Sequence, residues 1–316
     1  MAKGIVIYFS QSGNTRMIAE AIHKGMGHLT EQCDIVRLKD IHARDLAKYD
    51  LIGLGSPVWV YREPAIVAAF IDSMVPVDTE GKHVFSFCTH GTCMGNYFAK
   101  VVPALLQRGL TVIGWRDWYS SVFLPYMPKP YYTDGHPDEI DLKEAEDFGR
   151  EMAERSLKIS MGDASLIPTL PRGRDYDNRY NAFPGGAYNH IPKDMLEEFT
   201  KVRNFQFVIN MDKCTRCGIC EDNCPMNSID FSVSPPHFRP NCDRCWFCEQ
   251  ICPEGAIEVD WESHRKLLSK LADIMIAPPA EKAEAQGCFR RLVPIEDVNW
   301  NTPWYKVKKH PRFEVP

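Results

Sequence analysis

A run of four cysteines that occurs twice is the feature that most constrains this chain. The first run spans residues 214–225, the second spans residues 242–253, and each has the spacing C-x2-C-x2-C-x3-C-P. This is the spacing with which thiolates ligate cubane [4Fe–4S] clusters. Thiolates are soft ligands that bind iron well, and the close spacing lets one loop supply three corners of a cube. The sequence therefore predicts iron–sulfur clusters.

Zinc is the alternative metal for a segment so rich in cysteine. A structural zinc site needs four ligands, and these commonly come as two C-x2-C pairs. The third and fourth cysteines of each run would then be redundant. The spacing therefore favours iron–sulfur clusters over a pair of zinc ribbons.

The segment from about 206 to 260 resembles the two-cluster bacterial ferredoxin. The resemblance includes both runs and the apolar residue, Ile229 or Ile257, that follows each Cys-Pro pair. In that family the fourth cysteine of each run reaches the other cluster. The resemblance implies that cluster 1 is held by Cys214, Cys217, Cys220 and Cys252. It implies that cluster 2 is held by Cys242, Cys245, Cys248 and Cys224.

Composition and charge limit the class of protein. The 316 residues are 44% hydrophobic and 25% charged, which suits about two ordinary globular domains. A net charge of −5 is too small to indicate nucleic-acid binding, and no apolar run is long enough for a transmembrane segment. Because the other four cysteines show no pairing pattern, we expect no disulfide framework and a reducing, cytoplasmic location.

A polar loop near the start of the chain is the second informative motif. Residues 4–9 form an apolar run typical of a strand buried in a parallel sheet, and residues 16–25 have helical apolar spacing. The loop between them consists of Ser10, Gln11, Ser12, Gly13, Asn14 and Thr15. N–H groups at a helix start bind phosphate, and hydroxyl and amide side chains add donors. The alternative is an ordinary helix-capping loop.

The pattern Ser-x-Ser-Gly-Asn-Thr after the first strand resembles the phosphate loop of flavodoxins. In that family the loop holds the phosphate of FMN, so the resemblance implies this role for residues 10–15. The chain lacks the G-x-x-x-x-G-K-[ST] motif of ATP-binding loops. A G-x-G-x-x-G dinucleotide motif is also missing, because Val58 stands where the third glycine after Gly53 and Gly55 belongs.

The rest of the first 161 residues supports this resemblance. Apolar strands alternate with helices: strands at 33–38, 51–55, 83–88 and 111–114, and helices at about 65–74, 96–108 and 141–161. Such alternation predicts an α/β fold, here a flavodoxin-like doubly wound parallel sheet. Ligands of such sheets bind at the carboxyl ends of the strands, so we expect the loops 10–15, 56–63 and 89–97 to converge.

Two of these loops supply the predicted contacts to the flavin ring. The residues are Ser56, Pro57, Val58, Trp59, Tyr61, Thr89, His90, Gly91 and Tyr97. Trp59 or Tyr61 in the second loop, and Tyr97 in the third, are aromatic candidates for stacking on the ring. His90 is either a hydrogen-bond donor to the flavin or an ordinary surface histidine.

The chain thus divides into four predicted parts. Residues 1–161 form the flavodoxin-like FMN domain, and residues 162–205 form a linker rich in Pro, Gly and aromatic residues that packs at the domain junction. Residues 206–260 form a small α+β ferredoxin-like domain with two [4Fe–4S] clusters. Residues 261–316 form a C-terminal helix and an extended tail.

The whole chain resembles flavodoxin–ferredoxin fusion proteins. This resemblance implies a low-potential carrier that relays electrons between FMN and two [4Fe–4S] clusters, to or from a partner redox enzyme in anaerobic metabolism. No catalytic residue is predicted. Two alternatives stay open, namely a flavin-dependent oxidoreductase that reduces a quinone or another small organic acceptor, and a fixed subunit of a larger redox complex. Whether the chain forms a homo-oligomer is also open.

Overall fold

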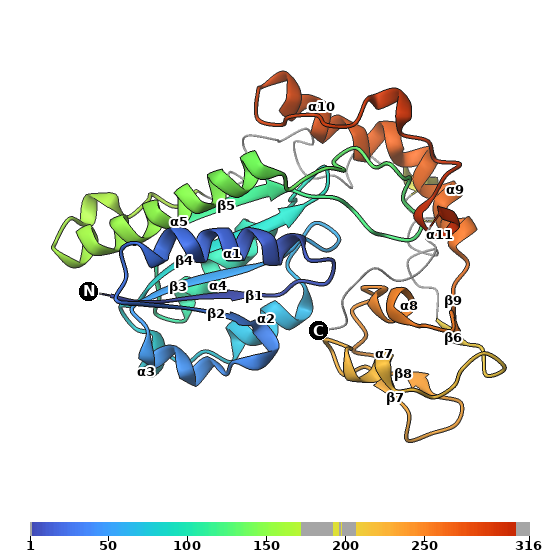
Figure 1. Cartoon of the computed structure of the whole chain (residues 1–316), viewed down its shortest axis with the longest axis horizontal. Coiled ribbons are helices and arrows are strands. Elements are labelled where there is room, and N and C mark those ends of the chain that lie inside the picture. Colours follow the sequence, from blue (N-terminus) through green and yellow to red (C-terminus); the bar gives the residue numbers. More distant parts are fainter. Residues whose placement is uncertain (1, 172–191, 196, 198–206, 308–316) are drawn as a thin grey trace. The chain divides into compact units, whose positions relative to one another are not determined.

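The computed structural model describes residues 2–171, 192–195, 197 and 207–307, and the chain divides into two compact units (Figure 1). The first unit comprises Met1–Ser121 and Gly135–Arg179, and the second comprises Val122–Asp134 and Tyr180–Pro316. The four aromatic residues predicted to pack the linker at the junction, Tyr176, Tyr180, Phe183 and Tyr188, lie outside the described residues.

A five-stranded parallel sheet forms the centre of the first unit. Its strands are β1 (Lys3–Tyr8), β2 (Gln32–Arg37), β3 (Leu51–Pro57), β4 (His83–His90) and β5 (Thr111–Tyr119). Their order is β2-β1-β3-β4-β5, and all neighbours run parallel. The predicted doubly wound, flavodoxin-like fold is therefore confirmed. The order reverses between β1 and β3, which is where such sheets bind their ligands.

Helices cover both faces of this sheet (Figure 1). One face carries α1 (Asn14–Gly27) and α5 (Glu139–Ser160), and the other carries α2 (Ala65–Asp72) and α4 (Tyr97–Gln107). Shorter turns are α3 (Pro76–Thr79), η1 (Leu38–Asp40), η2 (Ala43–Lys48) and η3 (Ala164–Leu166). Helix α5 begins with a capping box, in which the side chains of Asp138 and Asp141 each accept the other's backbone N–H.

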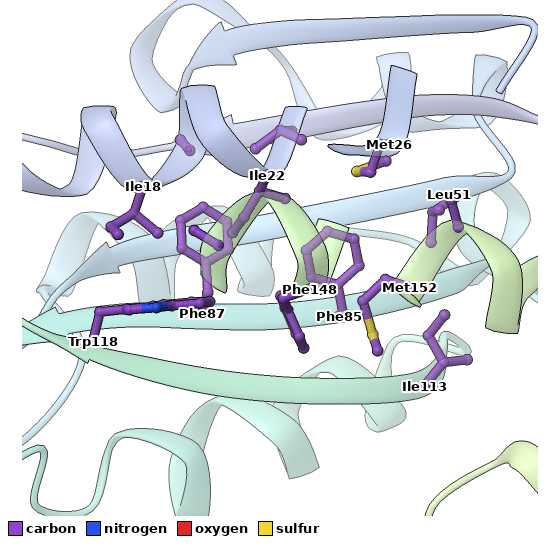
Figure 2. Close-up of a cluster of buried hydrophobic side chains, with 14 residues drawn as sticks. Ile18, Ile22, Met26, Leu51, Phe85, Phe87, Ile113, Trp118, Phe148 and Met152 are labelled. Atoms are coloured by element: carbon purple, nitrogen blue, oxygen red, sulfur yellow. The ribbon is translucent and has the colours of Figure 1, made fainter. Parts of the chain in front are cut away.

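The core beneath α1 and α5 consists of large apolar side chains (Figure 2). Phe148 of α5 meets Phe85 of β4 and Trp118 of β5 edge to face, with ring centroids 5.5 Å and 5.6 Å apart. The strand predicted to end at 114 continues to Tyr119, since Trp118 and Tyr119 are buried. This packing gives the carboxyl ends of the strands a rigid base.

The second unit has small elements, as expected for an α+β domain. Strand β6 (Val208–Ile209) pairs with β9 (Ile257–Glu258), and β7 (Ile229–Asp230) pairs with β8 (His237–Phe238), both antiparallel. The helices are α7 (Ile219–Asp222), α8 (Phe247–Ile251), α9 (Trp261–Leu271), the π-helical turn η6 (Ala272–Ile276), α10 (Ala277–Ala285), η7 (Ile295–Asp297) and α11 (Trp304–Val307). Within the described residues, no helix has both the length and the apolar character needed to cross a membrane.

One segment departs from the predicted domain division. Residues 122–134, which follow β5 and are called here the inserted segment, belong to the second unit and not to the first. Backbone hydrogen bonds hold the segment there, from Lys129 N to Thr302 O at 2.9 Å and from Trp304 N to Met127 O at 2.8 Å. The prediction that residues 1–161 form one continuous domain is therefore wrong at this segment. The other predicted boundaries stay predictions.

Candidate cofactor and metal sites

The loop between β1 and α1 contains unsatisfied polar atoms. Among the described residues, Ser10 Oγ and Gln11 Nε2 are buried without a hydrogen-bond partner. Ser12 is half-buried beside them, and Gly13 precedes the helix in a left-handed conformation. Buried polar groups are nearly always paired, so two orphaned atoms at a helix start indicate that a polar ligand completes the site. A phosphate accepts hydrogen bonds from such donors and from the first N–H groups of the helix.

The last two residues of this loop connect it to neighbouring strand ends. The side-chain amide of Asn14 donates to the carbonyl of Ser121 just beyond β5, at 2.8 Å. The hydroxyls of Thr15 and of Thr89, a buried residue of β4, lie 2.8 Å apart. Both Asn14 and Thr15 are buried. They therefore fix the loop against the sheet, while the preceding residues remain for the ligand.

The second and third predicted loops also contact each other. Val58 N donates to Thr89 O at 2.9 Å, next to Pro57, the last residue of β3. Asn96 N donates to Tyr61 O at 2.7 Å, and Tyr61 has a positive φ of 63°. The structure thus brings the three loops together at the carboxyl end of the sheet.

The aromatic candidates for stacking differ in their surroundings. Trp59 is half-buried, with its ring edge to face against Phe9 at 5.3 Å, so part of its surface is available to a ligand. Tyr97 is fully buried, and its hydroxyl lies 3.0 Å from Ser56 Oγ, which is also fully buried. Burial raises the pKa of Tyr97. The structure argues against direct ring contacts by Tyr97 and Ser56, because neither presents a surface to a ligand.

His90 is a buried residue of the sheet and not a surface histidine. Its Nε2 lies 3.0 Å from Asp117 Oδ2, and its Nδ1 lies 2.8 Å from the carbonyl of Gly91. A carbonyl only accepts, so Nδ1 is the donor in the contact with Gly91. The sequence did not indicate Asp117, because the strand that carries it was predicted to end three residues earlier. His90 therefore connects the start of the third loop, at Gly91, to Asp117 of the neighbouring strand β5.

A substitution at Gly95 tests the contact between the second and third loops. Gly95 has a φ of 60°, and a Cβ there would lie 2.4 Å from Tyr61 Cβ and 2.6 Å from its carbonyl oxygen. We expect Gly95→Ala to lower the free energy of unfolding by about 1–3 kcal/mol and to weaken FMN binding. Urea denaturation and FMN titration measure the two effects.

Gly81→Ala is the matched control, because Gly81 has a similar φ of 75° but an added Cβ there would have no atom of the described part of the chain within 4 Å, beyond its own neighbours. It should cost only the backbone strain, about 1 kcal/mol, and leave FMN binding unchanged. Equal effects of the two substitutions would show that the contact with Tyr61 does not matter.

In the second unit, cysteines of both runs line one pocket. Cys242, Cys245 and Cys248 of the second run meet Cys224 of the first run there. Burial raises the pKa of Cys248 well above its usual range, and the neighbouring Cys245 and Cys242 add to this shift. Iron binds thiolates, so cluster assembly must displace these protons. The four sulfurs fit the ligand set predicted for cluster 2.

The cysteines predicted for cluster 1 are also close in space but less covered. Burial raises the pKa of Cys220 to about 11, and the nearby Cys252 and Cys217 contribute to this rise. Cys252 belongs to the second run, so here too the fourth cysteine of one run approaches the other run. Cys214 is half-buried and Cys217 is exposed.

The backbone repeats the same features in both runs. Ser228 N donates to Cys224 Sγ at 3.2 Å, and Ala256 N donates to Cys252 Sγ at 3.3 Å. Corresponding residues have positive φ in the two runs, namely Arg216 and Arg244, Gly218 and Trp246, and Asn227 and Gly255. Backbone N–H groups that face sulfur stabilise thiolate charge and tune the potential of a cluster.

Comparison with protein families identifies two parts of the chain. A flavodoxin domain matches residues 5–96, and a 4Fe-4S binding domain matches residues 207–230. The first match covers the loop 10–15, most of β1 and the whole of β2 to β4, and the second covers the first cysteine run. The second run lies outside the matched residues.

Individual relatives match the first part of the chain. A flavodoxin of Maridesulfovibrio salexigens is 29% identical over 122 residues, which are 36% of this chain and 83% of that protein. Flavodoxin 1 of Escherichia coli strain K12 is 29% identical over 137 residues, 42% of this chain and 76% of that protein. Among solved structures, a flavodoxin from the domain Archaea aligns with a TM-score of 0.40 and 23% identity, covering 49% of this chain and 99% of that chain.

Proposed function

We propose that this chain relays electrons at low potential between FMN and two [4Fe–4S] clusters. The proposal is supported by the match of one part of the chain to a flavodoxin domain and of another part to a 4Fe-4S binding domain. The observation that carries this proposal is the meeting of Cys224 with Cys242, Cys245 and Cys248 around one pocket. Four cysteines from two runs are the donor set of a crossed cubane site, and an FMN-type site lies in the same chain.

The residues of each site have distinct roles in this proposal. Ser10, Gln11 and the N–H groups at the start of α1 hold the FMN phosphate, and Trp59 lies against the ring. The eight cysteines of the two runs hold the clusters as thiolates. When bound, FMN exchanges one or two electrons and each cluster exchanges one.

We further propose that the donor and the acceptor are redox proteins of anaerobic metabolism. An exposed ligand of cluster 1, Cys217, and a flavin site at the carboxyl end of the sheet suit exchange with a docked protein. Clusters of this kind are oxygen-labile, and the chain pairs none of its cysteines as disulfides, so we place it in a reducing cytoplasm.

Reductive titration of the anaerobically reconstituted protein tests the relay. We expect about eight iron atoms and one FMN per chain, and an uptake of about four electrons, two by FMN and one by each cluster. Electrons supplied by a reduced ferredoxin should then reach an acceptor protein only when this chain is present. The readouts are absorbance of the flavin and the cluster signals in electron paramagnetic resonance.

The alternative enzyme makes the opposite prediction. A flavin-dependent oxidoreductase would turn over NADH or NADPH with a quinone without a protein partner. Rapid turnover of that kind by the isolated chain would contradict the relay. Zinc in place of iron would contradict the clusters themselves.

A further inference from the structure

The two cysteine runs differ at one structurally equivalent position. Gly218 in the first run and Trp246 in the second immediately precede helices α7 and α8, with φ values of 78° and 63°. Glycine adopts this left-handed conformation freely, whereas a bulky residue there is an outlier. Such strain persists where the surroundings enforce it, and it often marks a functional position. The presence of a bulky side chain at position 246 therefore indicates that this side chain has a function.

Trp246 covers the pocket of cluster 2. Its side chain is 7% exposed and lines the pocket together with the four predicted cysteine ligands. Its ring meets Phe207 at 5.0 Å and Trp261 at 4.9 Å between centroids. A continuous aromatic wall thus separates this pocket from solvent on the side of Trp246.

The inserted segment completes this wall. The ring of Tyr126 lies 6.3 Å from Trp246, 5.7 Å from Trp261 and 5.4 Å from His264. The side-chain amide of Gln250, on α8, donates to the carbonyl of Phe123 at 2.9 Å and fixes the segment beside the cysteine run.

Cluster 1 has no equivalent cover at the corresponding position. Gly218 offers no side chain, and among the described residues its added Cβ would have only Asp222 Oδ2, at 3.8 Å, within 4 Å. The adjacent ligand Cys217 is exposed, and so are Thr215 and Arg216. The two clusters would therefore meet water to different extents.

Reduction adds one negative charge to a cluster that its thiolates already make anionic. Water stabilises that added charge, and an apolar wall does not. Solvent exposure is one of the factors that set the potential of such clusters. A covered cluster is therefore harder to reduce than an exposed one.

We propose that Trp246, backed by Tyr126, keeps water from cluster 2 and gives it a more negative reduction potential than cluster 1. The inference rests on the proposed function, because it requires that both clusters form. It assigns cluster 1 as the centre where electrons collect, and from which an external acceptor protein draws them.

Trp246→Gly in the full-length, anaerobically reconstituted protein tests this proposal. Glycine suits the backbone at this position, so the variant should fold and bind both clusters. A potentiometric titration followed by electron paramagnetic resonance should show one cluster about tenfold easier to reduce, a shift of about 59 mV for one electron, with the other unchanged. A chelator should also remove iron from that cluster faster. When Cys217→Ala, which removes cluster 1, is combined with Trp246→Gly, the reduction step with the shifted potential should remain in the titration.

Two Tyr126 variants complete the design. Tyr126→Phe keeps the ring and should leave both reduction potentials unchanged. Tyr126→Ala opens the aromatic wall and should raise the reduction potential of cluster 2. If Trp246→Gly lost cluster 2, the Tyr126→Ala shift would decide the outcome. In a variant that keeps about eight irons, unchanged reduction potentials, or equal shifts in the potentials of both clusters, would overturn this inference. The proposed function would not be affected by that result. A wild-type protein without iron would instead overturn the proposed function.

Discussion

Cys217→Ala should lower the iron content from about eight to about four atoms per chain and leave FMN bound. Cys217 is a predicted ligand of cluster 1, and alanine offers no atom that binds iron. The thiolates predicted for cluster 2 remain intact, so one signal in electron paramagnetic resonance should disappear and one should persist. Iron analysis, flavin absorbance and resonance spectra measure the three quantities.

Cys288→Ala is the matched control, because Cys288 is also exposed but lies outside both runs. It should keep the full iron content and both signals. Full iron content in Cys217→Ala would refute the ligand assignment. Loss of all iron in that variant would show that neither cluster assembles without the other.

Ser10→Ala should weaken FMN binding by about ten- to a hundredfold. Ser10 Oγ is buried without a partner among the described residues, so the proposed phosphate gives it its hydrogen bond. A hydrogen bond to a charged group contributes about 1.5–3 kcal/mol, which corresponds to this range of affinity. Fluorescence titration of the apoprotein with FMN measures the dissociation constant.

Riboflavin distinguishes a phosphate contact from a general effect on the site. Riboflavin has the same ring but no phosphate, so Ser10→Ala should leave its affinity unchanged. Ser165→Ala is the control for the substitution itself, because Ser165 is exposed and its hydroxyl donates to Asp163 nearby. Equal losses for FMN and riboflavin would contradict the phosphate role of Ser10.

Local signals made much of this molecule predictable from its sequence. The cysteine spacing and the polar loop after the first strand each depend on residues close in the chain, and a parallel strand is recognisable from its continuous apolar run. The flavodoxin-like fold then followed from the resemblance, and the structure confirms it with the strand order β2-β1-β3-β4-β5.

The surroundings of two predicted site residues depend on distant partners. Tyr97 was a candidate for stacking because its loop leaves a strand end, but its ring enters the core and its hydroxyl reaches Ser56 and the carbonyl of Phe87. The pairing of His90 with Asp117 joins residues on two strands. Nothing in the sequence around either residue indicates which side of the sheet its partner occupies.

The inserted segment was invisible to sequence patterns for the same reason. Residues 122–134 are rich in Pro and aromatic residues and lack helical or strand periodicity. Their partners, such as Thr302 and Gln250, lie more than a hundred residues further along the chain. Only the folded structure shows that this stretch belongs with the cysteine runs.

The inserted segment also determines how far the two halves of this protein are modular. The chain passes between the units three times, after Ser121, after Asp134 and after Arg179. A gene fragment that begins at residue 207 encodes all eight cluster cysteines but omits Tyr126 and Met127, whose carbonyl accepts from Trp304 N. The ferredoxin-type half is therefore no transferable cassette, and recombination at the linker would separate cluster 2 from part of its own cover.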